Sequence, residues 1–267
     1  MRRFYCSPEN ITNDKIYLPA SQAHHIKDVL RLKKNDKINI FDGKGKQYNC
    51  VITDLRPNEA VAKVVSSEFC LSKEASYTVT LAQALPNKPD KMDLVIEKAT
   101  ELGVDAVIPV AARRSVMKLS KSSRWEKIAS EAARQCGRCK VPEIKEIMPV
   151  EKAVSILSGN DIKLFPCIDK DTITLRDTLE DFKCRGMACR APAISVFIGP
   201  EGDFTKEEIN TARQGGFKLV SLGERVLRTE TAGLYVLSVL DYVMGNGDRL
   251  SQTTILRNNL SPPSRRQ

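Results

Sequence analysis

Two glycine-marked turns decide the fold of this chain: IGPEGDF at residues 198–204 and LGERVLRTETA at residues 222–232. A short run of apolar and β-branched residues precedes each turn, and a helical pattern follows it. Each turn therefore joins a strand to a helix, which places both at the strand ends of one α/β sheet. We expect the backbone of the two turns to build a ligand site at that edge.

The same alternation of strands and helices runs from residue 78 to residue 244. We predict strands at 78–85, 104–110, 162–166, 193–198 and 219–222. We predict helices at 89–102, 123–136, 150–157, 205–214 and 229–244, and the pattern of residues 169–192 is ambiguous. Ser123 with Glu126, and Thr205 with Glu208, have the spacing of capping boxes that begin two of these helices. The alternation predicts a mostly parallel α/β sheet.

Residues 1–70 have a different pattern and predict a small, mostly β domain. Strand-like runs lie at 37–41, 48–55 and 60–65, a hairpin turn DGKG at 42–45, and a short helix at 24–32. Several short strands with one small helix predict a compact barrel. The chain then divides into this barrel domain (1–70), an α/β domain (71–247) and a polar basic tail expected to be disordered (248–267), with residues 66–76 as linker.

The composition is that of a soluble globular protein, with 42% hydrophobic and 28% charged residues among 267. There is no apolar run long enough for a membrane helix and no secretory signal, so we expect a cytoplasmic protein. The eight cysteines are scattered, and we expect them to be reduced thiols. Cys136 and Cys139 have zinc-knuckle spacing but lack a second ligand pair, so we expect no metal site and interpret the spacing as chance.

The net charge of +9 is unevenly distributed. Residues 1–70 carry 12 Lys and Arg against 8 Asp and Glu, and residues 248–267 carry 4 against 1. A basic accessory domain indicates a polyanionic partner, although the same excess could serve solubility alone.

Several common chemistries are excluded by missing residues. The chain has no G-x-G-x-x-G for a dinucleotide, no G-x-x-x-x-G-K-[ST] for a triphosphate and no G-x-S-x-G nucleophile elbow. Its two histidines, His24 and His25, both lie in the small domain. The chemistry left to the two glycine turns is binding by backbone N–H groups at the start of a helix. Such groups bind an anion or the polar edge of a nucleobase.

The two turns resemble the signature loops of the RsmE family, SPOUT methyltransferases that modify N3 of a uridine, uridine 1498, in 16S ribosomal RNA. Further motifs match the family in the correct order: residues 25–32 with 41–43, 88–93, 97–104, 113–116, Trp125 and 135–138. One position departs from the pattern, because Asp203 stands where the family usually has a glycine.

The resemblance implies a PUA-like N-terminal barrel, a C-terminal trefoil knot, a homodimer and S-adenosylmethionine as the cofactor, with no metal. Three loops of the knot would form the cofactor pocket. The cofactor-binding residues implied by the family are Pro166, Gly199, Glu201, Gly202, Leu222, Gly223, Leu227 and Thr229.

For the chemistry, the resemblance implies deprotonation and methylation of N3 on an unpaired uridine. We expect Arg228 to stabilise the charge that develops on the uracil oxygens, unless it only pairs with Glu201 or Glu230 to hold the loops. Glu201 is the second catalytic candidate, either as a base or, as we favour, as a structural group. The expected contacts to 16S rRNA, within the small ribosomal subunit, are Arg2, Arg3, Arg31, Lys33, Lys34, Arg113, Arg114 and Arg138.

Two other functions fit the same residues. One is a SPOUT enzyme with another target, such as a ribose 2′-hydroxyl of transfer RNA. The other is an RNA-binding ribosome-assembly factor without catalysis, which the intact run Arg228-Thr229-Glu230-Thr231 disfavours.

Overall fold

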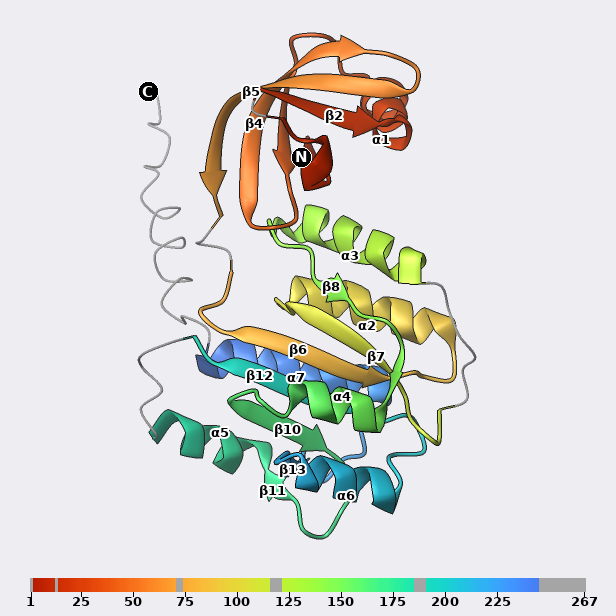
Figure 1. Cartoon of the computed structure of the whole chain (residues 1–267), viewed down its shortest axis with the longest axis vertical. Helices are drawn as coiled ribbons and strands as arrows, with labels where there is room; N and C mark the ends of the chain where they lie inside the picture. Colours follow the sequence, from red (N-terminus) through yellow and green to blue (C-terminus); the bar gives the residue numbers. More distant parts are fainter. Residues whose placement is uncertain (1, 13, 71–73, 116–121, 185–190, 245–267) are drawn as a thin grey trace, which may run out of the picture.

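The structure is a computed structural model that describes residues 2–12, 14–70, 74–115, 122–184 and 191–244. A five-stranded sheet from the first 69 residues lies at one end, and an eight-stranded sheet lies toward the other. Helix α3 (Ser122–Cys136) lies between them (Figure 1). The predicted tail at 248–267 falls outside the described residues. None of the helices in the described ranges combines the length and hydropathy needed to cross a bilayer.

The small sheet has the strand order β1-β3-β4-β5-β2. Its strands are β1 (Arg3–Tyr5), β2 (Lys15–Pro19), β3 (Lys37–Phe41), β4 (Lys46–Leu55) and β5 (Glu59–Phe69). The pair β1 and β3 is parallel and the other pairs are antiparallel. The mostly β prediction for this region is confirmed, and so is the hairpin turn between β3 and β4.

Two boundaries in this region differ from the prediction. The helix expected at 24–32 begins earlier, because α1 (Ala20–His24) continues into the π-helical turn η2 (His25–Val29). A separate short helix, η1 (Pro8–Asn10), precedes β2. The linker expected at 66–76 is wrong in its first part, because β5 continues to Phe69 alongside β4. Polar side chains alone suggested an irregular segment, whereas backbone pairing with β4 keeps it extended.

The large sheet has the order β11-β13-β10-β12-β6-β7-β8, and every pairing in it is parallel. Its strands are β6 (Thr78–Ala84), β7 (Ala106–Ala111), β8 (Glu143–Ile144), β9 (Met148–Pro149, which also pairs with β7), β10 (Ile162–Pro166), β11 (Ile173–Thr174), β12 (Ala193–Ile198) and β13 (Lys218–Ser221). The predicted parallel α/β sheet is confirmed. Because β12 lies between β10 and β6, the strand order changes direction at this point, which is where open α/β sheets bind ligands.

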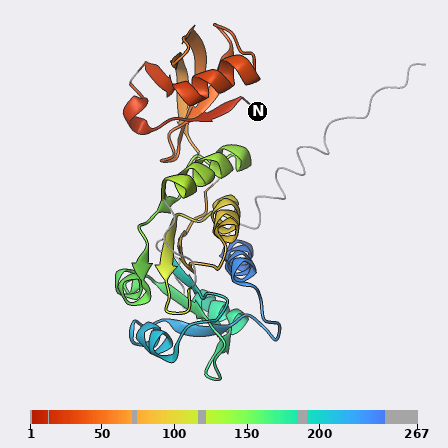
Figure 2. The same cartoon turned by 90° about the vertical axis from the view of Figure 1, so that its right-hand side faces the viewer.

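Helices cover both faces of this sheet, as Figure 2 shows from the side. One face packs against α2 (Pro89–Glu101), α5 (Leu175–Cys184) and α7 (Thr229–Met244), with α3 against α2. The other face packs against α4 (Val150–Leu157) and α6 (Lys206–Gln214) around the aromatic group of Phe165, Phe197, Phe204 and Phe217. Strands buried on both faces explain the nearly continuous apolar runs at 162–166 and 193–198.

The two expected capping boxes have different outcomes. Thr205 accepts a bond from the Glu208 backbone and Glu208 bonds back, as predicted. The box at Ser123 is wrong, because α3 begins at Ser122 and Ser123 lies inside the helix.

A buried arginine joins the small sheet to the end of α3. Arg3 is 1% exposed, and its guanidinium donates to the carbonyl oxygens of Ala133 (3.0 Å) and Arg138 (2.6 Å) at the end of α3. It also lies 4.1 Å above the Phe41 ring. The hairpin turn docks beside it, since Gly43 accepts from Val141 and Gly45 donates to the carbonyl of Cys139. The small sheet is therefore bonded to the large domain by side chain and backbone alike.

The expectation of reduced thiols is wrong for one pair. Cys70, after β5, and Cys139, after α3, form a disulfide at this junction. They are 69 residues apart, so only the docking of the two sheets brings them together. Cys136 stays free and exposed, which separates the two members of the supposed zinc knuckle.

Candidate active site

A cavity of about 440 Å³ opens at the carboxyl ends of β10, β12 and β13. Three loops line it: residues 166–169 after β10, the first glycine turn after β12 and the second glycine turn after β13. The expected site at the sheet edge is therefore present. Of the eight residues expected to bind the cofactor, seven line the cavity: Pro166, Gly199, Glu201, Leu222, Gly223, Leu227 and Thr229.

The eighth residue, Gly202, does not line the cavity. Its carbonyl oxygen accepts a 2.7 Å bond from Arg114, and a Cβ at this position would lie 3.4 Å from the Arg114 side chain. In the first turn, Gly199 and Glu201 thus line the cavity, whereas Gly202 contacts Arg114.

Asp203 explains how the first turn keeps its shape. Its φ of 58° lies in the left-handed region, which favours glycine and tolerates aspartate. Its carboxylate accepts from the backbone N–H of Phe204 (2.8 Å) and of Ile168 (2.9 Å). The second bond ties the first turn to the loop after β10, so the departure from the family pattern adds a link between two walls of the cavity.

A chain of hydrogen bonds joins the two glycine turns. Thr229, at the start of α7, donates its hydroxyl to the carbonyl oxygen of Gly199 across 2.5 Å. The same hydroxyl accepts 2.9 Å from the side-chain amide of Gln83, a fully buried residue of β6. Gly223 has a φ of 110° and no heavy atom within 4 Å of where a Cβ would stand, so the second turn leaves open space beside its backbone.

Glu201 and Glu230 share a cation that the sequence did not identify as a site residue. The Lys91 ammonium, near the start of α2, lies 2.6 Å from Glu201 and 3.7 Å from Glu230. The backbone N–H of Asn87 also donates to both Glu201 oxygens at 3.2 Å. Burial acts to raise the pKa of Glu201, but the bonds from Lys91 and from backbone N–H groups outweigh it, and the pKa is lowered. A carboxylate held in this state is a poor general base.

Arg228 is exposed in the second turn and lines the cavity. Among the residues that the structure describes, no carboxylate pairs with it, and the cation beside Glu201 and Glu230 is Lys91. The alternative in which Arg228 only holds the loops through one of these ion pairs is therefore not the arrangement observed.

The thiol in the cavity wall is not an active nucleophile. Burial, assisted by the charges of Asp203 and Asp169, raises the pKa of Cys167 to about 12. Its sulfur therefore stays protonated near neutral pH, and the thiolate form that attacks substrates is scarce. Within the described ranges, no group of three or more His, Cys, Asp and Glu side chains could hold a metal ion.

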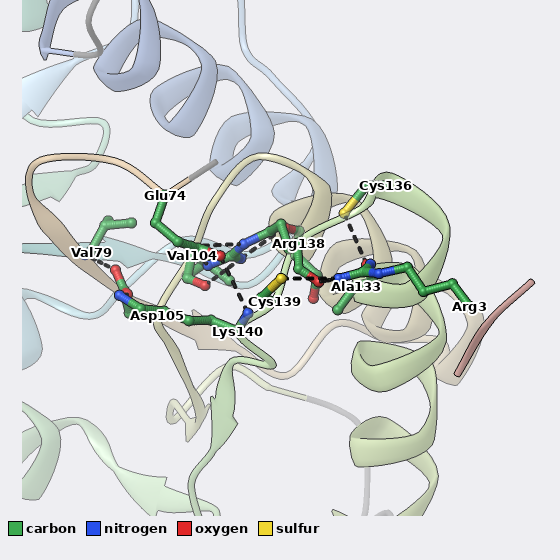
Figure 3. A network of polar contacts seen from close by, with 11 residues as sticks. Arg3, Glu74, Val79, Val104, Asp105, Ala133, Cys136, Arg138, Cys139 and Lys140 are labelled. Carbon is green, nitrogen blue, oxygen red and sulfur yellow. Dashed lines mark hydrogen bonds and ion pairs between the residues drawn. The ribbon is translucent and has the colours of Figure 1, made fainter. Parts of the chain in front are cut away.

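Two of the eight expected RNA contacts are corrected. Arg3 bonds the end of α3, as described above, and is buried. Arg138 is 5% exposed, pairs with Glu74 at 2.8 Å and donates to the carbonyls of Thr100 and Val104 (Figure 3). Neither guanidinium can reach a phosphate. Their sequence neighbours gave no signal of this, since the partners lie up to 135 residues away.

The other six basic residues are exposed. Arg2, Arg31, Lys33 and Lys34 lie on the small domain, while Arg113 and Arg114 follow β7. Arg114 bonds the first glycine turn and Arg113 lies 3.7 Å from Glu207, so this pair is placed beside the cavity loops.

Known families match both parts of the chain. Residues 73–241 match an RNA methyltransferase domain and residues 18–65 an RNA methyltransferase PUA domain. Ribosomal RNA small subunit methyltransferase E of Synechocystis is 32% identical over 246 residues, covering 91% of this chain and 78% of that protein. The Bacillus subtilis enzyme of the same name is 29% identical, covering 84% of this chain and 89% of its own length.

Solved structures agree with this assignment. Ribosomal RNA small subunit methyltransferase E from Neisseria gonorrhoeae, bound to S-adenosylmethionine, has a TM-score of 0.78 and 33% identity over 91% of this chain and 98% of its own. A putative methyltransferase from Legionella pneumophila, also bound to this cofactor, has a TM-score of 0.77 and 29% identity over 91% and 97%. The chain belongs to the ribosomal RNA small subunit methyltransferase E family, the RsmE family of RNA methyltransferases.

Proposed function

We propose that the protein transfers a methyl group from S-adenosylmethionine to N3 of uridine 1498 in 16S rRNA. The observation that carries this proposal is Arg228, an arginine without an ion pair among the described residues, beside the cavity that three strand-end loops enclose. The named relatives act on ribosomal RNA of the small subunit, and two structural neighbours hold this cofactor.

The residues around the cavity suit S-adenosylmethionine. Ile198, Leu222, Leu227 and Ala232 offer apolar walls for adenine, and the turns offer backbone polar groups for its edge. Asp169, Glu201 and Asp203 also line the cavity, and their acidic groups would suit the positive charge on the sulfur and amino group of the cofactor. Gly223 leaves room for close approach to the backbone.

When bound, the cofactor supplies a methyl group on a positively charged sulfur. The residues of the chain prepare the acceptor. Uracil N3 lies on the Watson–Crick edge, so the base must be unpaired or extruded before it can enter. As N3 gives up its proton to solvent water, negative charge spreads to the two uracil oxygens, where Arg228 stabilises it. The bound cofactor would supply its methyl group to the N3 lone pair and would leave as the neutral thioether. Glu201 acts by holding the loop, since Lys91 occupies its carboxylate.

The basic surface is proposed to hold the RNA. Arg2, Arg31, Lys33 and Lys34 would contact phosphates from the small domain, and Arg113 and Arg114 would contact them next to the cavity. We assign residues 1–70 to RNA binding and residues 71–247 to methyl transfer, and we expect the knot of the family in the latter. The assembled small subunit in the cytoplasm is the expected substrate.

We also propose a homodimer that uses the outer side of α7. Tyr235 and Tyr242 on this helix are 43% and 87% exposed, and Leu94 on the adjacent α2 is 40% exposed. Light scattering should give twice the chain mass, and Tyr242→Glu should lower it. A monomer at all concentrations would contradict this part of the proposal.

The test is to incubate the protein with isotope-labelled S-adenosylmethionine and small subunits that lack the modification, then locate the methyl group by mass spectrometry. The expected product is N3-methyluridine at position 1498. Transfer to a ribose 2′-hydroxyl would replace the uracil assignment by the other SPOUT target. No transfer, together with no cofactor binding by calorimetry, would leave only the RNA-binding assembly factor.

A further inference from the structure

Lys91 occupies a position that links three parts of the site. It lies on the first turn of α2, while Glu201 belongs to the first glycine turn and Glu230 to the first turn of α7. Its ammonium donates 2.6 Å to Glu201 and lies 3.7 Å from Glu230. The side chain of Lys91 is 22% exposed, so this contact is partly shielded from water.

Glu230 depends on this lysine more than Glu201 does. Its side chain is 12% exposed, and one carboxylate oxygen, Oε2, is buried without a hydrogen bond among the described residues. Glu201 has the additional bonds from the Asn87 backbone. Removal of Lys91 would leave Glu230 partly buried and uncompensated, a state that favours capture of another cation.

Arg228 is the cation placed to be captured. It lies two residues before Glu230 and lines the same cavity as Glu201. The hydrogen bond to Glu201 raises the pKa of Lys91, and the positive charge of Arg228 opposes that rise, so the two cations lie within electrostatic reach. Arg225 in the same turn is also exposed and lines the cavity.

We propose that Lys91 is a positioning residue that occupies Glu201 and Glu230 and thereby keeps Arg228 unpaired for the substrate. This inference rests on the proposed role of Arg228. Two cations and two carboxylates balance in charge here, yet only one of the cations is bound to the carboxylates. The division between a holding cation and a free cation gives the site an arginine that need not break an ion pair before it meets the uracil.

The direct test measures how available Arg228 is, without any assay of methyl transfer. An arginine-selective dicarbonyl reagent modifies unpaired guanidinium groups, and peptide mass spectrometry gives the rate at each arginine. In Lys91→Met we expect the modification rate at Arg228 to fall by about fivefold. This is the effect expected if Arg228 forms one ion pair worth about 1 kcal/mol. Arg225 serves as the internal reference and should keep its rate.

Rescue distinguishes this role from general support of the loops. In Lys91→Met/Glu230→Gln the captured arginine loses its partner, so the labelling rate at Arg228 should return to within about twofold of the wild type. Lys98→Met is the matched control, because Lys98 is also ion-paired on α2, with Glu97 and Glu101, away from the cavity. It should leave Arg228 unchanged.

Activity gives a second, separable readout. With the small subunit as substrate, Lys91→Met should lower kcat by about fivefold with little change in cofactor Kd, and the added Glu230→Gln should recover part of it. Unchanged labelling of Arg228 in Lys91→Met, or a loss that Glu230→Gln does not reverse, would overturn the proposal for Lys91. If the wild type transfers no methyl group, the proposed function fails and the labelling result alone decides the role of Lys91.

Discussion

The hydroxyl of Thr229 lies 2.5 Å from the carbonyl oxygen of Gly199, and this bond connects the two glycine turns directly. Thr229 is 5% exposed and receives a second bond from Gln83. A buried hydroxyl with both a donor and an acceptor partner is costly to remove, because each partner is left unsatisfied. The distance between two walls of the cavity therefore depends on one threonine.

Thr229→Ala should weaken S-adenosylmethionine binding. The lost bonds are worth about 1–3 kcal/mol, which corresponds to roughly fivefold to 150-fold in Kd. Thr229→Ser keeps the hydroxyl and should stay close to the wild type. Isothermal calorimetry measures both, and equal affinities for the alanine and serine variants would argue against the hydroxyl.

Arg228→Ala should reduce turnover much more than cofactor binding. Loss of one charge-stabilising donor typically lowers kcat by about 10²–10³-fold. The one described hydrogen bond of Arg228 is from its backbone carbonyl to the Ala232 N–H, and the alanine substitution leaves it in place. Single-turnover methylation and calorimetry separate the two effects. Arg176→Ala, an exposed arginine on α5, is the control. Equal losses in turnover and in cofactor affinity would assign Arg228 to loop support instead.

Arg3→Met should destabilise the protein by about 2–4 kcal/mol in urea unfolding, because the carbonyls at the end of α3 lose a buried donor. Arg2→Met is the matched control, since its side chain is exposed and lies 4.0 Å from Asp36. That neighbouring change should stay within about 0.5 kcal/mol of the wild type. A similar stability for both variants would mean that the junction tolerates the loss.

Arg31→Ala, Lys33→Ala and Lys34→Ala should each weaken RNA binding and reduce its salt dependence. A lost phosphate contact lowers the slope of log K against log salt by about 0.7–0.9, without a change in the methylated position. Binding titrations at several KCl concentrations give the slope. Lys152→Ala on α4 is the comparison for an exposed lysine elsewhere. Three unchanged slopes would move the RNA surface away from this part of the small domain.

Stability should fall in alkaline solution because of two buried thiols. Burial raises the pKa of Cys6 and of Cys50 to about 12, from the ordinary value of 9.0. The folded protein keeps these protons while the unfolded chain releases them, so the contribution is full below pH 9.0 and is lost progressively as the pH rises toward 12. Tm measured between about pH 8 and pH 10.5 should drop less in Cys6→Ala/Cys50→Ala. Parallel curves would assign the drop to other groups.

Most of the helices and strands could be predicted from local patterns in the sequence. The strands at 162–166 and 193–198, the helix at 229–244 and the Thr205 capping box were all predictable, because apolar periodicity and capping act over a few residues. Three features of the structure depend on contacts between residues far apart in the sequence. Arg3 and Arg138 looked like surface charge because their partners are distant in sequence, and the Cys70–Cys139 pair depends on the docking of two sheets.

The candidate site was predictable in its loops and less so in its charges. The glycines located the cavity walls, since glycine marks the tight turns that join strand to helix. Lys91 was visible only as part of a motif, because its partner Glu201 is 110 residues away. Asp203 stood out as a departure from the family, but its bond to Ile168 needed the fold.

The hairpin turn of the small sheet docks on residues 139–141 through two backbone hydrogen bonds, with Arg3 inserted beside it. A chimera that exchanges only residues 1–70 with those of a relative would cut through this junction. The segment from Cys136 to Val141 would have to travel with the donor sheet. We therefore expect such a chimera of this chain to keep its stability only if the end of α3 is exchanged together with the small sheet.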